Sequence, residues 1–334
     1  MGLQRIALTE LNGEVSGRIK TLICSASFEG RCLSVPLNLD PSSIDIALVC
    51  HTDDRLEPIE PNLAKLKSHF GAKYRSVKLD TTFPVRSADS LSEELGPGDG
   101  EILKDILLDA TTFTHEGLLI LLRLLALRLR ASSHLFLVYT PAAEYSLGSA
   151  ENQKWLSKGV GEIRSVLGYP GRMLPSRKMH LILLTGFESE RALELMDSYE
   201  PSVLSLGIGS DSVEPNPNQI ARLAMLKKRK DSYEAFDEFT FSRMDYNKAA
   251  ASISAQIEKF PGYNTVLAPM NTKLSTIGAA LTAMRMPRTQ LSYAQAHTYN
   301  IESYSRAADY CLMSPFPELV QATSIATTGE QSRA

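Results

Sequence analysis

Two short polar segments of this 334-residue chain combine hydroxyl, carboxamide and charged side chains at spacings suited to holding an anion. Residues 109–114 read Asp-Ala-Thr-Thr-Phe-Thr, and residues 271–276 read Asn-Thr-Lys-Leu-Ser-Thr. Each segment follows a short apolar run and precedes a helix-forming stretch, which predicts a helix N-terminus. Unpaired backbone N–H groups and the helix dipole attract phosphate to such a terminus. Ordinary helix capping explains the same residues without a ligand, and Lys273 favours phosphate in the second segment.

Two pairs of tyrosines follow other predicted strands. Tyr139 and Tyr145 are six residues apart, and so are Tyr293 and Tyr299. These rings could stack on a base or hydrogen-bond a ribose. Alternatively, they are strand-end aromatics that pack on a neighbouring helix.

Two glutamates come directly after predicted buried strands. Glu29 follows one strand and Glu188 follows another, and each has an arginine close behind it, Arg31 and Arg191. The carboxylates could accept hydrogen bonds from ribose hydroxyls. Internal ion pairs with the two arginines are the alternative.

The sequence does not name a catalytic nucleophile. It has no GxGxxG after the first strand, no GxxxxGK[ST] and no GxSxG, which disfavours a dinucleotide cofactor, a P-loop NTPase and an α/β-hydrolase. His115, Glu116 and His297 are the acid–base candidates near the predicted site, and each lone residue of this kind is more often structural. We expect no cofactor.

Composition indicates a globular chain of about two domains with no electrostatic reason to bind nucleic acid or an anionic membrane. There are 35 Lys and Arg against 38 Asp and Glu, and hydrophobic residues make up 43%. The four cysteines form no CxxC pair and the six histidines no HxxxH or HExxH pair, so a metal site has no support. No apolar run is long enough to span a bilayer, and we expect a cytoplasmic protein.

A long internal repeat runs through the chain. Residues 22–29 (LICSASFE) resemble 181–188 (LILLTGFE), and Asp-Pro-Ser at 40–42 resembles Glu-Pro-Ser at 200–202. The polar segment at 109–114 has its counterpart near 268–273, and residues 138–145 match 292–299 without a gap. Because the matches keep their order and include polar residues that packing does not require, we interpret the repeat as an internal duplication. General similarity between strand–helix units is the alternative.

Each copy contains five short apolar runs alternating with helical segments. The predicted strands of the first copy lie near 21–27, 44–50, 74–79, 105–109 and 134–139, and those of the second near 180–186, 203–209, 237–242, 264–269 and 289–293. Continuous rather than alternating apolar runs indicate strands buried on both faces of a parallel sheet. The fold class is therefore α/β, with two tandem Rossmann-like, doubly wound domains.

We expect four segments along the chain. They are a first domain at 1–148, a helix-and-loop connector at 149–178 that contains the only tryptophan, a second domain at 179–318, and a flexible tail at 319–334.

Ligands of open parallel sheets bind beyond the carboxyl ends of the strands, at the switch in strand order. The loops after the first, fourth and fifth strands of each copy meet there, and these loops carry the repeated polar residues. The ligand-binding candidates are Glu29, Asp109, Thr111, Thr112, Thr114, Tyr139, Tyr145, Glu188, Asn271, Thr272, Lys273, Thr276, Tyr293 and Tyr299.

The fourth-strand loops resemble the ligand loop of CARF domains, the Rossmann-like sensors of cyclic oligonucleotides in prokaryotic immunity. Asp109-Ala110-Thr111 resembles the Asp-x-Thr version of that loop, and Asn271-Thr272-Lys273 resembles the Gly-Thr-Lys version, with Asn in place of Gly. Two such units in one chain resemble the related SAVED arrangement. The resemblance implies a pocket between the copies that binds a nucleotide second messenger.

The expected function is therefore that of a cytoplasmic defence sensor that binds a phosphate-bearing nucleotide and signals to a partner effector chain. Such a sensor could also form a homo-oligomer. The divergent loops of the two copies predict an asymmetric ligand or one degenerate half-site. Two alternatives stay open. One is an enzyme acting on a nucleotide or sugar phosphate, with Lys273 holding phosphate and His115, Glu116 or Glu188 transferring protons. The other is a non-catalytic scaffold subunit.

Overall fold

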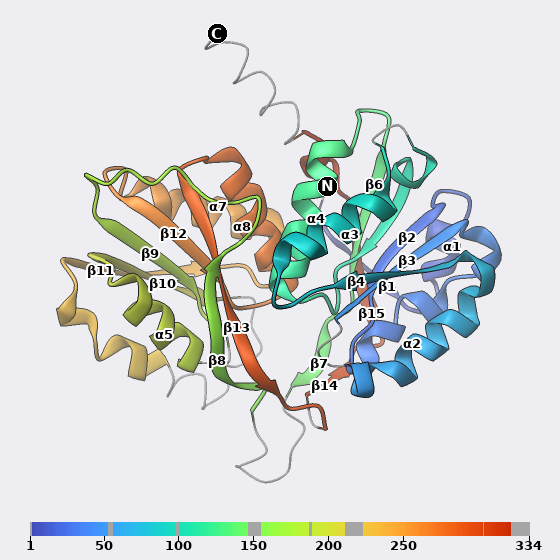
Figure 1. The fold of residues 1–334 in the computed structure, drawn as a ribbon, viewed down its shortest axis with the longest axis horizontal. Coiled ribbons are helices and arrows are strands. Elements are labelled where there is room, and N and C mark those ends of the chain that lie inside the picture. Colours follow the sequence, from blue (N-terminus) through green and yellow to red (C-terminus); the bar gives the residue numbers. More distant parts are fainter. Residues whose placement is uncertain are drawn as a thin grey trace. The chain divides into compact units, whose positions relative to one another are not determined.

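The computed structural model describes residues 2–52, 56–97, 100–145, 155–186, 189–210, 223–302 and 304–321 of the chain. The chain separates into two compact units, Met1–Leu147 with Ile301–Ala334, and Gly148–Asn300. Each unit is built on one main β-sheet with helices between successive strands (Figure 1).

The first unit contains a seven-stranded sheet in the order β1-β15-β6-β5-β2-β3-β4. The strands from β6 to β4 pair in parallel, whereas β15 pairs antiparallel with β6 and β1 antiparallel with β15. Their bounds are β1 Gln4–Ala7, β2 Thr21–Ser25, β3 Ile46–Thr52, β4 Tyr74–Leu79, β5 Asp105–Asp109, β6 His134–Tyr139 and β15 Tyr310–Pro315. A separate antiparallel pair joins β7 (Ala142–Tyr145) to β14 (Ser305–Ala307).

The second unit contains a six-stranded sheet in the order β11-β10-β9-β12-β13-β8. Its five strands from β11 to β13 pair in parallel, and β8 pairs antiparallel with β13 at the edge. The bounds are β8 Ser157–Ser165, β9 Met179–Leu184, β10 Val203–Gly209, β11 Ala235–Phe241, β12 Asn264–Pro269 and β13 Thr289–Tyr299.

The five parallel strands have the same order in both sheets. Numbered along the chain within each unit, they run 3-2-1-4-5, the order of a doubly wound Rossmann-like sheet. All ten predicted strands are present within a few residues of their expected bounds, although β13 continues well beyond its predicted end. The predicted α/β fold class of two Rossmann-like domains is confirmed.

Helices cover both faces of each sheet, which explains the uninterrupted burial of the central strands. In the first unit, Leu22 and Cys24 of β2 share a core with residues of α1 and α2, whereas α3 and α4 pack against each other. In the second unit, Leu181 and Leu183 of β9 share a core with α5, whereas α7 and α8 pack against each other. The bounds are α1 Leu11–Val15, α2 Leu56–Phe70, α3 Pro84–Leu95, α4 His115–Arg128, α5 Ser189–Tyr199, α7 Tyr246–Glu258 and α8 Lys273–Arg285. Among the described residues, no helix is long and apolar enough to cross a membrane.

Strand register relates the two copies residue by residue. Leu22 of β2 pairs with Leu107 of β5, and in the second sheet Leu181 pairs with Val266. These are the same pairs that the sequence repeat aligns. The register of the fifth strands likewise makes Leu137, opposite Leu108, equivalent to Leu291, opposite Leu267. Continuing two residues along each strand makes Tyr139 equivalent to Tyr293, as the ungapped match predicts.

The boundaries of the compact units differ from the predicted segments. The expected helix-and-loop connector instead contributes the long strand β8 to the second sheet. Strands β14 and β15, expected in the second domain, belong to the first unit. Of the expected tail, residues 322–334 lie outside the described part of the chain.

Candidate functional site

In both sheets the strand order reverses between the first and fourth parallel strands, β2 and β5 in one unit and β9 and β12 in the other. The carboxyl edge at this switch is the place where a doubly wound sheet offers loops to a ligand. The described candidate residues come from the ends of these strands, the turns and helix starts that follow them, and the fifth strands.

Asp109 lies at the carboxyl end of β5 and is only 2% exposed. Its carboxylate accepts hydrogen bonds from the backbone N–H of Thr111, at 3.0 Å, and from the Thr111 hydroxyl. The same hydroxyl oxygen accepts from the backbone N–H of Thr140, at 3.0 Å, and so links the loop after β5 to the end of β6. Burial raises the pKa of Asp109 to about 6, against the lowering effect of its hydrogen bonds with Thr111. The hydrogen bonds of Asp109 and Thr111 thus stabilise the loops at this edge of the sheet.

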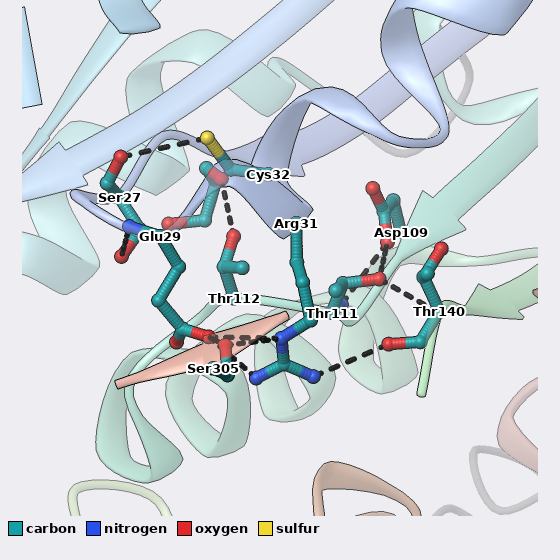
Figure 2. A network of polar contacts seen from close by, with 10 residues as sticks. Ser27, Glu29, Arg31, Cys32, Asp109, Thr111, Thr112, Thr140 and Ser305 are labelled. Carbon is teal, nitrogen blue, oxygen red and sulfur yellow. Dashed lines mark hydrogen bonds and ion pairs between the residues drawn. The ribbon is translucent and has the colours of Figure 1, made fainter. Parts of the chain in front are cut away.

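A second buried network is centred on Arg31, in the turn η1 (Gly30–Leu33), and is drawn in Figure 2. Oε2 of Glu29 accepts from Nε and Nη2 of Arg31, at 2.8 and 2.7 Å, and from the Ser305 hydroxyl at 2.6 Å. Nη1 of Arg31 donates to the Thr140 carbonyl at 3.2 Å, and the guanidinium carbon lies 5.5 Å from the centre of the Tyr145 ring. Of the two alternatives for Glu29, the structure has the internal ion pair.

The remaining threonines of the first loop also serve the backbone. Thr112 donates from Oγ1 to the Ser25 carbonyl at 2.6 Å, which ties the loop after β5 to the end of β2. Thr114 is the N-cap of α4, where its Oγ1 accepts from the Gly117 N–H at 3.0 Å. Both hydroxyls are therefore used by the local fold.

The four tyrosines divide by burial. Tyr139 and Tyr293 are 2% and 7% exposed, and burial raises the pKa of Tyr139. This burial fits the packing alternative for the two inner rings. Tyr145 and Tyr299, at the ends of β7 and β13, are half-buried and keep accessible surface.

The loop after β12 combines Asn271 and Thr272 in a tight arrangement. Nδ2 of Asn271 donates to the Thr185 carbonyl at 2.5 Å, and its Oδ1 accepts from the Thr272 N–H at 2.9 Å. Thr272 is the N-cap of α8, where its Oγ1 accepts from the Ser275 N–H at 3.2 Å and donates to the Arg243 carbonyl at 2.6 Å. Asn271 thus joins the loop after β9 to the start of α8.

Lys273 is the first residue of α8 and is half-buried, so its cationic side chain begins at the positive end of the helix. Thr276 is fully buried and donates from Oγ1 to the Thr272 carbonyl at 3.1 Å, within its own helix. Position 268, which the register makes equivalent to Asp109, is alanine, so the second edge lacks the buried carboxylate of the first.

Arg191 in the second unit repeats one contact of Arg31. Its Nη1 donates to the Ala294 carbonyl at 3.3 Å, as Arg31 does to the carbonyl of Thr140. The fifth-strand register makes Thr140 and Ala294 equivalent. Glu188, the predicted partner of Arg191, lies outside the described residues.

Sequence reasoning missed several residues that build these edges. Ser305 joins the Arg31 network from far along the chain, and the backbone of Thr140 serves both networks of the first unit. A Cβ on Gly186 would lie 2.0 Å from the Met270 carbonyl oxygen, so this position requires glycine for the loops after β9 and β12 to approach. Only the Thr-Gly step after the strand could have signalled Gly186.

The acid–base candidates that the structure describes lie in both units. His115 and Glu116 form the first turn of α4, where Glu116 is 6% exposed, and His297 is an exposed residue of β13. Within the described ranges, no cluster of His, Cys, Asp and Glu is placed to hold a metal ion.

Strand order and edge loops together define a protein of two Rossmann-like units. A search of protein-family models finds no match, and neither does a search of curated protein sequences. Among solved structures, the chain is similar to a type III CRISPR defence DNA nuclease activated by cyclic oligoadenylate, with a TM-score of 0.52 and 9% identity over 86% of this chain and 67% of that one.

A second solved structure, the cytoplasmic domain of a prokaryotic cation chloride cotransporter, matches with a TM-score of 0.25 and 10% identity, over 86% of this chain and 98% of that one. A TM-score this low does not indicate a shared fold. The first likeness, at 9% identity, concerns the fold alone.

Proposed function

We propose that this protein is a sensor of a cyclic oligonucleotide in a prokaryotic defence system. The observation that carries the proposal is the repetition of one strand order and register in two units, each with a threonine-capped helix directly after its fourth strand. Capped helix starts at the switch of a doubly wound sheet are where phosphates bind. A ligand with repeated phosphates suits a repeated binding edge.

The second unit supplies the stronger anion subsite. Lys273 adds a cation at the start of α8, and Asn271 holds the preceding loop through hydrogen bonds on both sides of its carboxamide. In the first unit, Asp109 and Glu29 place carboxylates at the edge, and both carboxylates accept hydrogen bonds from the protein itself. The two half-sites are therefore chemically unequal, in line with an asymmetric ligand or one degenerate half-site.

The likeness to a nuclease activated by cyclic oligoadenylate supports this ligand class. We propose that the protein works in the cytoplasm and that ligand binding alters its contact with a separate effector chain. The half-buried Tyr145 and Tyr299 are proposed to contact a base or ribose of the ligand.

Calorimetric titration with cyclic di-, tri-, tetra- and hexa-adenylate, followed by mass spectrometry of the nucleotides, tests the proposal. A sensor binds one member of the panel and returns it intact. Turnover of a nucleotide would favour the alternative of an enzyme. Absence of binding across the panel would favour the alternative of a non-catalytic scaffold subunit. The stoichiometry distinguishes one ligand shared by both copies from one ligand in each.

A further inference from the structure

We infer that the two copies exchange their sixth strands, so that the segment pairing antiparallel with the fifth strand of each copy is the one that belongs by sequence to the other copy. After the fifth strand of the first copy, the chain leaves the first unit and next forms β8, which completes the second sheet. After the fifth strand of the second copy, the chain returns and forms β14 and β15, which complete the first unit.

Strand register shows that β8 and the β14–β15 segment are equivalent. In the second sheet, Ser157 lies opposite Tyr299 and Lys158 opposite Thr298. In the first unit, Ser305 lies opposite Tyr145 and Arg306 opposite Glu144. Farther along, Arg164 is opposite Tyr293 and Leu312 opposite Tyr139. The residue numbers of the equivalent partners differ by 148 for 157 and 305, 158 and 306, and 164 and 312. The difference is 147 for 160 and 307, which lie opposite Ala296 and Ala142 beside the register shifts.

An irregularity recurs at the same position in both units. The pairing of β13 with β8 shifts register between Ala294 and Ala296. The equivalent place in the first copy is the break between β6 and β7, at Thr140 and Pro141. An interruption at the same place in both copies is expected if the paired segments were duplicated together.

A side chain on the segment that enters the first unit reaches an edge loop of that unit. Ser305 donates to Glu29 and accepts from Nε of Arg31 at 3.1 Å. At the equivalent position, Ser157 is buried, and its hydroxyl has no hydrogen-bond partner among the described residues. Each exchanged segment therefore begins at the edge where the candidate ligand loops of the receiving unit lie.

The chain passes between the two units twice. Tyr145 ends β7 and Tyr299 ends β13, and the chain passes from one unit to the other within a few residues of each. The exchange itself does not depend on the proposed ligand.

Paired cysteine substitutions in the full chain test the exchange, because directly opposed residues of antiparallel strands have Cα atoms about 4.5–5.5 Å apart, within the range that a disulfide bridges. The four positions are exposed strand residues: Glu144, Lys158, Thr298 and Arg306. The native cysteines, Cys24, Cys32, Cys50 and Cys311, are all buried and free. Peptide mapping after mild oxidation identifies the disulfides that form.

Exchange predicts intramolecular disulfides in E144C/R306C and in K158C/T298C. The matched controls are E144C/K158C and R306C/T298C, the pairs that would be opposed if each copy kept its own sixth strand, and these should stay reduced. Cross-linking in either control, or its absence from both exchanged pairs, would overturn the inference. Disulfide-linked dimers would contradict an exchange within one chain.

Discussion

Asp109 and Arg31 are charged residues buried at the carboxyl edge of the first sheet, and they are stabilised in different ways. Arg31 has a carboxylate partner, whereas Asp109 is held by the backbone and hydroxyl of Thr111. At the residue scale, we therefore expect Arg31 to affect stability through its ion pair and Asp109 to affect stability through its protonation.

The Asp109→Asn substitution should change the pH dependence of stability. The pKa of Asp109 is 3.8 in the unfolded chain and about 6 in the fold. Between these values the folded state holds a proton that the unfolded chain has lost, so this carboxyl lowers the free energy of unfolding as pH rises from 4 to 6. Asparagine keeps the acceptor oxygen and removes the titration. Relative to wild type, the variant should gain about 3 kcal/mol across that window.

Urea unfolding at pH 4 and pH 7 measures this difference. The comparison with wild type is needed because burial lowers the pKa of His180 to about 4, and a buried neutral histidine makes stability fall as pH decreases from 6.5 to 4. A difference between variant and wild type that is the same at both pH values would contradict the raised pKa of Asp109.

Replacing Arg31 by methionine should destabilise the protein by roughly 3–5 kcal/mol, because it leaves the carboxylate of Glu29 buried without its ion pair. The double variant Arg31→Met/Glu29→Gln removes both charges and should recover much of the loss. Thermal or urea unfolding of the two variants checks this. A double variant no more stable than Arg31→Met would show that the ion pair is not what the arginine serves.

At the element scale, the approach of loops decides whether the edge of the second sheet can form. Gly186 follows β9 at the point where the loop after β12 comes closest, and a Cβ there meets a backbone carbonyl. Backbone cannot move aside as readily as the end of a side chain.

Gly186→Ala should therefore destabilise the second unit by roughly 1–3 kcal/mol, the usual range for overpacking. Gly30→Ala is the matched control in the first unit, because a Cβ added at Gly30 would meet nothing within 4 Å. Urea unfolding of both variants gives the comparison. Equal stability of the two would contradict the close approach at Gly186.

The sequence predicted the parallel elements and missed the antiparallel ones for a physical reason. Strands such as β2 and β12 are buried on both faces and read as continuous apolar runs. Strand β8 lies at a sheet edge, is largely polar and contains Gly159 and Gly161, so it lacks the continuous apolar run of a buried strand. Local patterns do not record which sheet a strand joins, and therefore β15 was expected in the wrong unit.

Side-chain roles were predictable to the same limited extent. The positions of Thr114 and Thr272 at helix starts follow from the sequence, and the structure has both as N-caps. The sequence could not decide whether Glu29 binds a ligand or an internal partner. One of its hydrogen-bond donors, Ser305, is remote in sequence and reaches Glu29 only through tertiary pairing.

At the scale of the whole molecule, one topology is used twice and the two copies have diverged at their edges. The first edge is filled by Asp109 and the Arg31 ion pair, whereas the second has alanine in place of the aspartate and carries Lys273. This difference concentrates the proposed anion binding in the second unit, where a single charge can be tested.

The most direct test is a calorimetric titration with the cyclic oligoadenylate that binds best, comparing wild type, Lys273→Ala and the control Lys178→Ala. Lys178 is an exposed lysine just before β9, at the opposite end of the strand from the edge loops. A charge-assisted contact to phosphate contributes about 1.5–3 kcal/mol, so Lys273→Ala should weaken binding roughly 10- to 150-fold while Lys178→Ala binds like wild type. No binding by wild type, or equal affinities for all three proteins, would contradict an anion site at the start of α8.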